Sequence, residues 1–201
     1  MRIACIAAAA ALAAGCFGGM REQAAPPLIY RVDAPALAAG AALPVDLKVV
    51  VSGTAPGLDG AGIAGRWPNQ RLDYLAGARW ADRLPVLVGA ALAEAFQDSG
   101  RLRSVQGDLG RFRASHTLVV DVRRFEADYT AGGLPVAQVS LAVTLGRASD
   151  RRVLAAFTAT ASESASANRQ GAVVEALGVA FARAANEAAA KVFGALESEP
   201  K

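Results

Sequence analysis

Alternation of apolar and polar residues along the chain predicts most of its strands. The clearest run covers residues 45–51, where Val or Leu stands at every odd position between mostly polar neighbours. A period of two is typical of a strand with one buried face and one exposed face. Similar runs predict further strands at 28–33, 71–76, 102–107, 116–129, 135–146 and 151–161.

The strand expected at 116–129 changes parity part-way along. Its apolar side chains occupy even positions from 118 to 122, whereas Phe125 and Tyr129 occupy odd positions. One extra residue in a strand moves every later side chain to the other face. The sequence therefore predicts a β-bulge near Arg123–Arg124.

Two segments show the spacing of three and four residues that marks one face of a helix. The first covers residues 82–98, and we expect Asp82 to cap its start. Pro85 stands in the first turn, where its missing N–H is not needed, and Ser99–Gly100 should end the helix. The second segment is an alanine-rich stretch at 171–196.

The order of these elements is three strands, one helix, four strands and one helix. Successive strands favour antiparallel hairpins, and helices then cover one side of the sheet. The sequence thus predicts an α+β fold, with a single domain, a largely antiparallel or mixed β-sheet and two main helices packed on one face. A length of 201 residues with 53% hydrophobic content suits one core of this kind.

The first 15 residues have the pattern of a bacterial secretion signal. Arg2 precedes an apolar run, and small residues stand before Cys16. The run is shorter than the stretch of about 20 residues that a membrane-spanning helix needs. A small-residue site that ends in cysteine resembles the lipobox of bacterial lipoproteins, in which the cysteine receives the lipid. We therefore expect a signal peptide at 1–15, lipid attachment at Cys16, a tether at 16–27 and a folded domain at 28–198.

Neighbouring residues bear on this interpretation. Ala13 stands where the lipobox most often has leucine, and the alternative is ordinary cleavage that leaves Cys16 as a free thiol. Phe17 follows the cysteine where an aspartate would resemble an inner-membrane retention signal. We therefore expect the anchor to lie in the outer membrane, on its periplasmic face, rather than in the inner membrane. With Cys5 removed and Cys16 modified, the mature chain would hold no free thiol and no disulfide.

The charge balance gives no indication of a nucleic-acid partner. Loss of Arg2 from the 21 basic residues leaves 20 against 18 acidic ones, a net charge of about +2. The arginines are spread along the chain and interleaved with acidic residues, whereas a nucleic-acid-binding protein carries a clustered basic stripe. We therefore expect no nucleic acid among the partners.

Residues 60–65, GAGIAG, match the G-x-G-x-x-G pattern of dinucleotide-binding turns. This pattern binds a pyrophosphate only where the glycines directly follow a strand and open a helix. Here the first glycine lies eight residues past Ser52, and no helical pattern begins before Asp82. We therefore expect no nucleotide cofactor and interpret Gly53–Gly65 as a surface loop.

The candidate catalytic residues are few. His116 is the single histidine, so a histidine-based metal site is not expected. A lipoprotein hydrolase that uses His116 with Ser115 or another serine is the alternative function, but strand periodicity places Asp121 on the opposite side from His116 and no G-x-S-x-G motif is present. Alternation along the predicted strand also places Glu126 and Asp128 on one face and Asp121 on the other. This separation does not favour acid-base chemistry by these three residues. The sequence predicts no catalytic residue, no metal and no cofactor.

A recognisable pattern begins at Leu58 and continues through LDYLAGARWADRLP to Arg103. With the strand HTLVVDVRRFEADY and the lipobox, it resembles the ABC-type transport auxiliary lipoprotein family, whose best-studied type is the Pqi C-component. The resemblance covers about residues 28–195, although relatives often end the last helix with tryptophan and this chain has Phe193. The matching residues are Leu58, Asp59, Ile63, Tyr74, Leu75, Arg79, Trp80, Ala81, Asp82, Leu84, Pro85, Asp121, Arg123, Phe125 and Glu126.

The resemblance implies a non-catalytic periplasmic subunit of an MCE-type lipid transport system. Its partners would be an MCE-domain protein and the ABC permease and ATPase of the same system, and its copies would form a ring. A lipid carrier with an apolar cavity between sheet and helices is a further alternative, and the sequence does not separate docking from cavity binding.

The roles of four residues in the matching segment can be interpreted in two ways. Tyr74 and Trp80 are expected to anchor the first helix to the sheet by burying their rings, and Arg79 and Asp82 to form a local ion pair and helix cap. The alternative is that these four residues contact a partner. Trp67, within the same region, is less easily placed.

Overall fold

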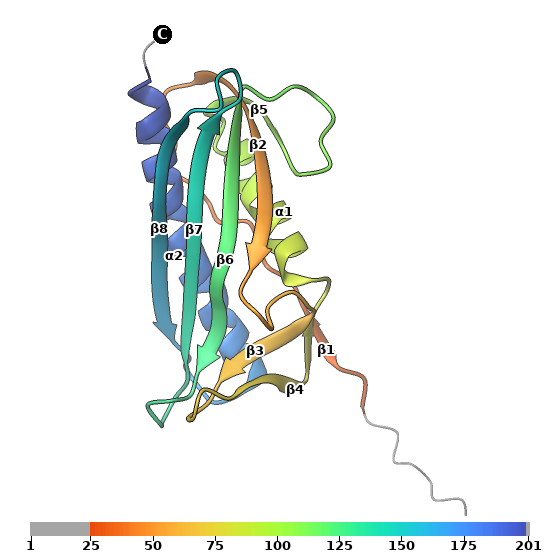
Figure 1. Ribbon diagram of the computed structural model, residues 1–201. Coiled ribbons are helices and arrows are strands. Elements are labelled where there is room, and N and C mark those ends of the chain that lie inside the picture. The colour runs from red at the N-terminus through yellow and green to blue at the C-terminus, as the bar shows by residue number, and fades with distance from the viewer. Residues whose placement is uncertain (1–24, 200–201) are drawn as a thin grey trace, which may run out of the picture.

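The alternating segments of the sequence form one mixed sheet, and two helices cover one of its faces (Figure 1). The computed structural model describes residues 25–199. The predicted α+β class is confirmed, with eight strands in the sheet. In chain order the elements are β1 (Leu28–Tyr30), β2 (Leu43–Thr54), β3 (Gly62–Arg66), β4 (Leu72–Trp80), α1 (Leu84–Asp98), β5 (Leu102–Gln106), β6 (His116–Asp128), β7 (Val136–Arg147), β8 (Val153–Ser164) and α2 (Gln170–Glu197).

Strand β6 lies at the centre of the sheet. It pairs antiparallel with β7, and β8 pairs antiparallel with β7 beyond it. On its other side β6 has two successive neighbours, because β2 runs parallel to its first part and β3 runs parallel to its last residues. Strand β5 extends the β2 branch, whereas β4 and β1 extend the β3 branch.

The branching gives the sheet two different ends. We call the end where β6 begins the upper end, and it carries the loop 107–115 and the turn 148–152 (Figure 1). We call the other the lower end, and it carries the turns 67–71 and 129–135 together with β1.

The predicted β-bulge lies in β6 near the place where its neighbour changes. The register with β7 shifts between Val122 and Arg124, so Arg123 is the extra residue. A bulge increases the local twist of a strand. Here it separates the part of β6 that pairs with β2 from the part that pairs with β3.

The bulge also corrects the parity expected for the acidic residues of β6. Beyond it Phe125 faces the core, so Glu126 and Asp128 point to the outer face, on the same side as Asp121. The expectation that Asp121 lies on the opposite face from Glu126 and Asp128 is wrong. It counted positions across the bulge without the extra residue, and one residue reverses the parity.

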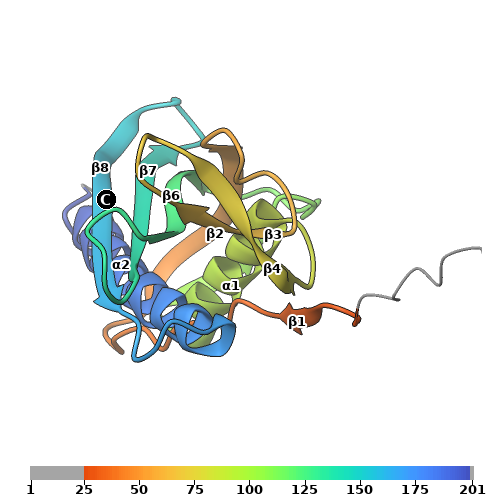
Figure 2. The same cartoon turned by 90° about the horizontal axis from the view of Figure 1, so that it is seen from below.

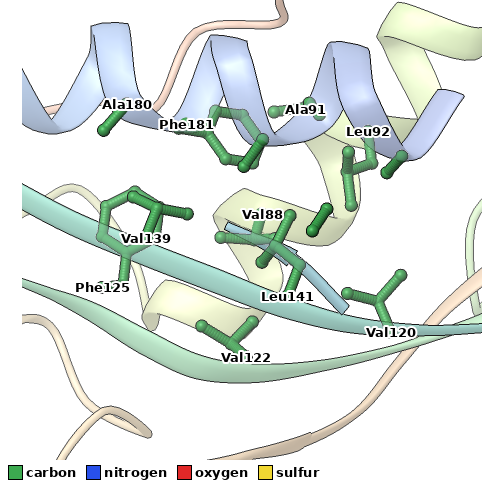
Figure 3. Packing of buried hydrophobic residues seen from close by; sticks show 14 of the residues in the cluster. Val88, Ala91, Leu92, Val120, Val122, Phe125, Val139, Leu141, Ala180 and Phe181 are labelled. Atoms are coloured by element: carbon green, nitrogen blue, oxygen red, sulfur yellow. The ribbon is translucent and has the colours of Figure 1, made fainter. Parts of the chain in front are cut away.

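The core lies between the inner face of β6 and β7 and the two helices (Figure 3). Phe125 is at its centre, with its ring centroid 5.8 Å from Trp80 of β4 and 5.8 Å from Phe181 of α2. Rings of this size contribute roughly 2–3 kcal/mol each when they are buried. They join the lower branch of the sheet to the C-terminal helix.

Helix α1 begins later than the sequence predicts. Arg83, not Asp82, precedes its first turn, and no side chain among the described residues caps the N-terminus. The Asp82 carboxylate instead accepts a hydrogen bond from the adjacent Arg83 N–H at 2.6 Å. The predicted end is confirmed, because Ser99 is the C-cap and donates its hydroxyl to the Phe96 carbonyl at 2.7 Å. Gly100 follows with a φ of 66°.

The glycine-rich segment is not only a loop, as the sequence suggested, because residues 62–66 form β3. A Cβ atom on Gly62 would lie 2.4 Å from the Tyr74 ring, and one on Gly65 would lie 2.4 Å from the Trp67 ring. Two glycines of GAGIAG therefore leave room for aromatic side chains. A short strand made of small residues lacks the alternation that predicts a strand.

Candidate functional site

Trp80 and Tyr74 lie in different environments. Trp80 is 1% exposed, whereas Tyr74 is 46% exposed, so the expected burial is wrong for Tyr74. The paired residues Gly62↔Arg79 and Ala64↔Tyr74 are two positions apart in β3 but five positions apart in β4. Three additional residues reverse the parity of β4, and they place its two aromatic rings on different sides.

Tyr74 holds the glycine-rich segment against β4. Its ring covers Gly62, and its hydroxyl donates a hydrogen bond to the Gly57 carbonyl at 3.0 Å. The exposed part of the ring is free for other contacts.

Arg79 and Asp82 do not form the expected ion pair with each other in the part of the chain that the structure describes. Both side chains are exposed. The local ion pair forms instead between Arg83 and Asp59, with 2.5 Å between nitrogen and oxygen, and Arg83 Nε also donates to the Asp59 carbonyl at 3.0 Å. Because Arg79 and Asp82 are exposed and adjacent to the start of α1, they are available to a partner.

The upper end brings together a serine, a histidine and a carboxylate. His116 is buried, its Nδ1 lies 3.0 Å from the Ser115 hydroxyl, and its Nε2 lies 2.9 Å from Glu199. The order of groups is that of a Ser-His-acid triad, but the two ring nitrogens are exchanged, because in that triad Nε2 faces the serine and Nδ1 faces the acid. Asp121 is on the other face of β6, as the parity predicted, and Glu199 takes the position of the acid. Glu199 lies 83 positions from His116, so no local pattern in the sequence points to it.

Contacts with neighbouring groups indicate that this cluster joins parts of the fold. The Ser115 hydroxyl oxygen accepts the Asp46 backbone N–H at 3.0 Å and lies 3.1 Å from the Asp46 carbonyl oxygen. Arg147 Nε lies 2.5 Å from Glu199, without the alignment of a hydrogen bond, so the contact is an ion pair. The cluster thus connects the end of α2 to the first residues of β6 and the last residue of β7.

The Asp46 side chain adds a second group of contacts at the upper end. Hydrogen bonds from the Arg103 guanidinium and then from the Ser104 hydroxyl lower the pKa of Asp46 to about 2. The carboxylate is therefore ionised at neutral pH, and it ties β2 to β5.

Charged residues on the outer face of β6 form a second cluster. Asp128 accepts hydrogen bonds from Arg66 at 2.8 Å and from the Thr130 hydroxyl at 2.6 Å, and Arg124 pairs with Glu126 at 3.1 Å. Burial acts to raise the pKa of Asp128, but the hydrogen bonds from Thr130 and Arg66 outweigh it, so the pKa is lowered. Glu126 and Asp128, which were expected to be solvated, are thus paired with arginines. These pairs stabilise the sheet and do not form an acid-base site.

Aromatic side chains line a cavity at the lower end. The ring of Trp67 stacks on Tyr129 with centroids 4.7 Å apart and planes within 7°, and the Arg71 guanidinium lies 5.4 Å from the Trp67 centroid. The cavity of about 580 Å³ lies between these rings, Tyr74 and the start of α2.

A groove of about 570 Å³ lies beside β2. Its walls are the last residues of β2, the first turns of α1 and the loop residues 107–109. The ladder between β2 and β5 ends at Lys48↔Gln106, so no strand lies beside Val49–Thr54 on that side within the described residues. Buried apolar side chains pack between the sheet and both helices (Figure 3), where a lipid carrier was expected to have its cavity. The groove beside β2 is therefore the candidate site for a bound lipid.

Comparison with known proteins identifies the family. The model of the ABC-type transport auxiliary lipoprotein component matches residues 33–189. The chain belongs to this family. A solved structure with a similar fold is protein XCC0632 from Xanthomonas campestris, a DUF330 protein with 28% identity and a TM-score of 0.75, covering 84% of this chain and 96% of that one. An uncharacterized protein with 15% identity has a TM-score of 0.64, with coverage of 84% and 99%. No match was found among curated proteins.

The remaining expectations for this auxiliary lipoprotein concern its anchor and its ligands. Cys16 lies outside the described residues. Neither α1 nor α2 combines the length and the hydropathy of a helix that crosses a membrane. Within residues 25–199, no three His, Cys, Asp or Glu side chains gather as metal ligands would.

Proposed function

We propose that this chain is the non-catalytic lipoprotein subunit of an MCE-type ABC lipid transport system. The family match over residues 33–189 carries the proposal, since that family is an auxiliary component of ABC-type transport. The partners are an MCE-domain protein and the ABC permease and ATPase of the same system. The proposal includes a signal peptide at 1–15, a tether at 16–27 and a domain at 28–198.

The proposed anchor is a lipid on Cys16, held in the periplasmic leaflet of the outer membrane. The apolar signal followed by small residues and cysteine supports it. Mass spectrometry of the N-terminal peptide from native membranes tests it, with an acylated Cys16 as the expected result. A Cys16→Ser variant should fail to mature and should leave the outer-membrane fraction. An unmodified thiol at the mature N-terminus would overturn the anchor.

The proposed docking surface includes Tyr74, Arg79 and Asp82, whereas Trp80 supports it from the core. The exposure of the first three side chains supports this division. Charge reversal in Arg79→Glu and Asp82→Arg should lower the recovery of MCE and permease components after crosslinking in membranes. Arg111→Glu, at an exposed arginine of the upper end, is the matched control. Wild-type protein that recovers none of these components would contradict the transport function.

A ring of identical copies is part of the same proposal. Native mass spectrometry of the detergent-solubilised protein measures it directly. A closed oligomer of fixed size is expected, and a monomer at all concentrations would contradict the ring.

A hydrolase is the second candidate function, because Ser115, His116 and Glu199 lie in the order of a catalytic triad. Against it, the Asp46 backbone already engages the Ser115 hydroxyl, and neither the lower-end cavity nor the groove beside β2 is lined by Ser115 or His116. Substitution of His116 by Ala tests this candidate. If cells that carry His116→Ala or Ser115→Ala keep the wild-type envelope phenotype, the hydrolase function is excluded.

A further inference from the structure

Large apolar side chains gather at the lower end of the sheet. Leu28 and Ile29 of β1 are 55% and 62% exposed. Leu72 and Tyr74 of β4 and Leu134 of the β6–β7 turn are also exposed. Figure 2 views the molecule from this end and shows β1, β3 and β4 together on it. Exposed apolar groups that gather at one end of a folded chain mark an interaction surface.

The stacked rings of the same end suit the boundary between water and lipid. Trp67 and Tyr129 are half-buried, and each has a large apolar ring with a polar group. Trp and Tyr are enriched where membranes meet water for this reason. Arg71 lies over Trp67, where its guanidinium can also meet a phosphate.

The chain before the described residues leads to this same end. Ala25, the first described residue, precedes β1 by three positions, and β1 lies at the lower end (Figure 1). Nine residue steps from Cys16 to Ala25 reach at most about 30 Å when fully extended. A lipid on Cys16 therefore keeps the lower end within about that distance of the bilayer, whatever conformation the intervening residues adopt.

We propose that the lower end of the sheet lies on the phospholipid bilayer and is a second membrane contact beside the acyl anchor. The inference rests on the proposed anchor at Cys16 and adds the face that the domain turns toward the lipid. Leu28 and Ile29 of β1, Leu72 of β4 and Leu134 of the β6–β7 turn enter the headgroup region, with the Trp67 and Tyr129 rings at its border. A lipid chain and a protein surface together hold a domain at a membrane more firmly than either alone.

The opposite end of the molecule supplies a matched control. Leu109 and Phe112, in the loop 107–115, are 94% and 88% exposed, which exceeds the exposure of the lower-end residues. They precede β6, whereas the lower-end turn 129–135 follows it, and 13 residues of strand separate the two ends by about 40 Å. If exposure alone caused membrane contact, both ends would respond equally to substitution.

Tryptophan fluorescence tests the proposal, because the two tryptophans report different places. The full-length product is purified from membranes and reconstituted into vesicles whose phospholipids carry brominated acyl chains, which quench nearby indole rings. Trp80 is buried and contributes equally to wild type and to Trp67→Phe, so their difference is the Trp67 signal. The expected result is a loss of that signal in brominated vesicles compared with unbrominated ones.

Two pairs of substitutions complete the experiment. Leu28→Ser with Ile29→Ser should restore part of the Trp67 fluorescence, whereas Leu109→Ser with Phe112→Ser should leave the quenching unchanged. All four positions are exposed, and circular dichroism checks that each variant is folded. Absence of Trp67 quenching, or equal effects of the two pairs, overturns the proposal.

The mass of the N-terminal peptide, measured on the same sample, separates this proposal from the anchor. Acylated Cys16 without Trp67 quenching overturns the membrane-facing surface and leaves the anchor standing. Trp67 quenching without an acyl group supports the surface and overturns the anchor.

Discussion

The ring of Tyr74 occupies the space that a side chain at Gly62 would need, with 2.4 Å between its Cδ1 and an ideal Cβ. Gly62→Ala should therefore destabilise the domain by about 1–3 kcal/mol, since the ring or the β3 backbone must move. Unfolding in urea, followed by circular dichroism, measures the change.

The neighbouring glycine gives the control for this prediction. A Cβ on Gly60 would meet nothing closer than 3.9 Å, so Gly60→Ala should be nearly neutral. Combining Gly62→Ala with Tyr74→Ala should cost less than the sum of the two single changes, because the clash disappears. Equal losses for Gly60→Ala and Gly62→Ala would show that the ring is not the cause.

Removal of the Phe125 ring should be among the most damaging substitutions. The ring contacts both Trp80 and Phe181, and Phe125→Ala should lower the free energy of unfolding by about 3–5 kcal/mol. Phe112→Ala is the matched control, because Phe112 is 88% exposed and its loss should change the free energy by less than about 0.5 kcal/mol. Similar losses in both variants would contradict the described core.

Loss of the Glu199 carboxylate should loosen the end of α2. Glu199→Gln weakens the contacts with His116 and Arg147, and we expect a cost of about 1–3 kcal/mol. Amide hydrogen exchange should become faster in the last turns of α2. Glu187→Gln, which removes an exposed pair with Lys191, should cost less than about 0.5 kcal/mol. Unchanged exchange in the Glu199 variant would refute the connection.

Asp128 makes stability depend on pH in a definite direction. Its folded-state pKa is lowered, so its contribution is complete above the unfolded-state pKa of about 3.9. The contribution is lost as the pH falls through the lower folded-state pKa. Asp128→Asn should therefore reduce the free energy of unfolding at pH 7, and the difference from wild type should shrink as the pH falls below 4.

Urea unfolding of both proteins across this pH range measures the effect. Asp121→Asn is the control on the same strand, because it removes only a 3.8 Å exposed pair with Arg123 and should cost less than about 0.5 kcal/mol. A difference between wild type and Asp128→Asn that stays constant with pH would exclude titration of Asp128 as its source.

The candidate site could be predicted from the sequence only in part. The bulge at Arg123 left a visible change of parity, and the end of α1 was marked by Ser99–Gly100. The environment of Tyr74 left no such mark, because it depends on three extra residues of β4 that appear only when β4 is paired with β3. Glu199 was missed for a similar reason, since 83 positions separate it from His116.

The sequence by itself determined the α+β class, the two helices and nearly all of the strands. Their periodicity follows from which side chains must leave water, and that requirement is local. The sequence also contained the motif that resembles the transport auxiliary lipoproteins. The tertiary structure alone decided which residues meet: Tyr74 over Gly62, Glu199 beside His116, and apolar side chains of separate strands together at the lower end. Such contacts depend on strand register and on the branching of the sheet at β6, which long-range packing sets and no short window of residues contains.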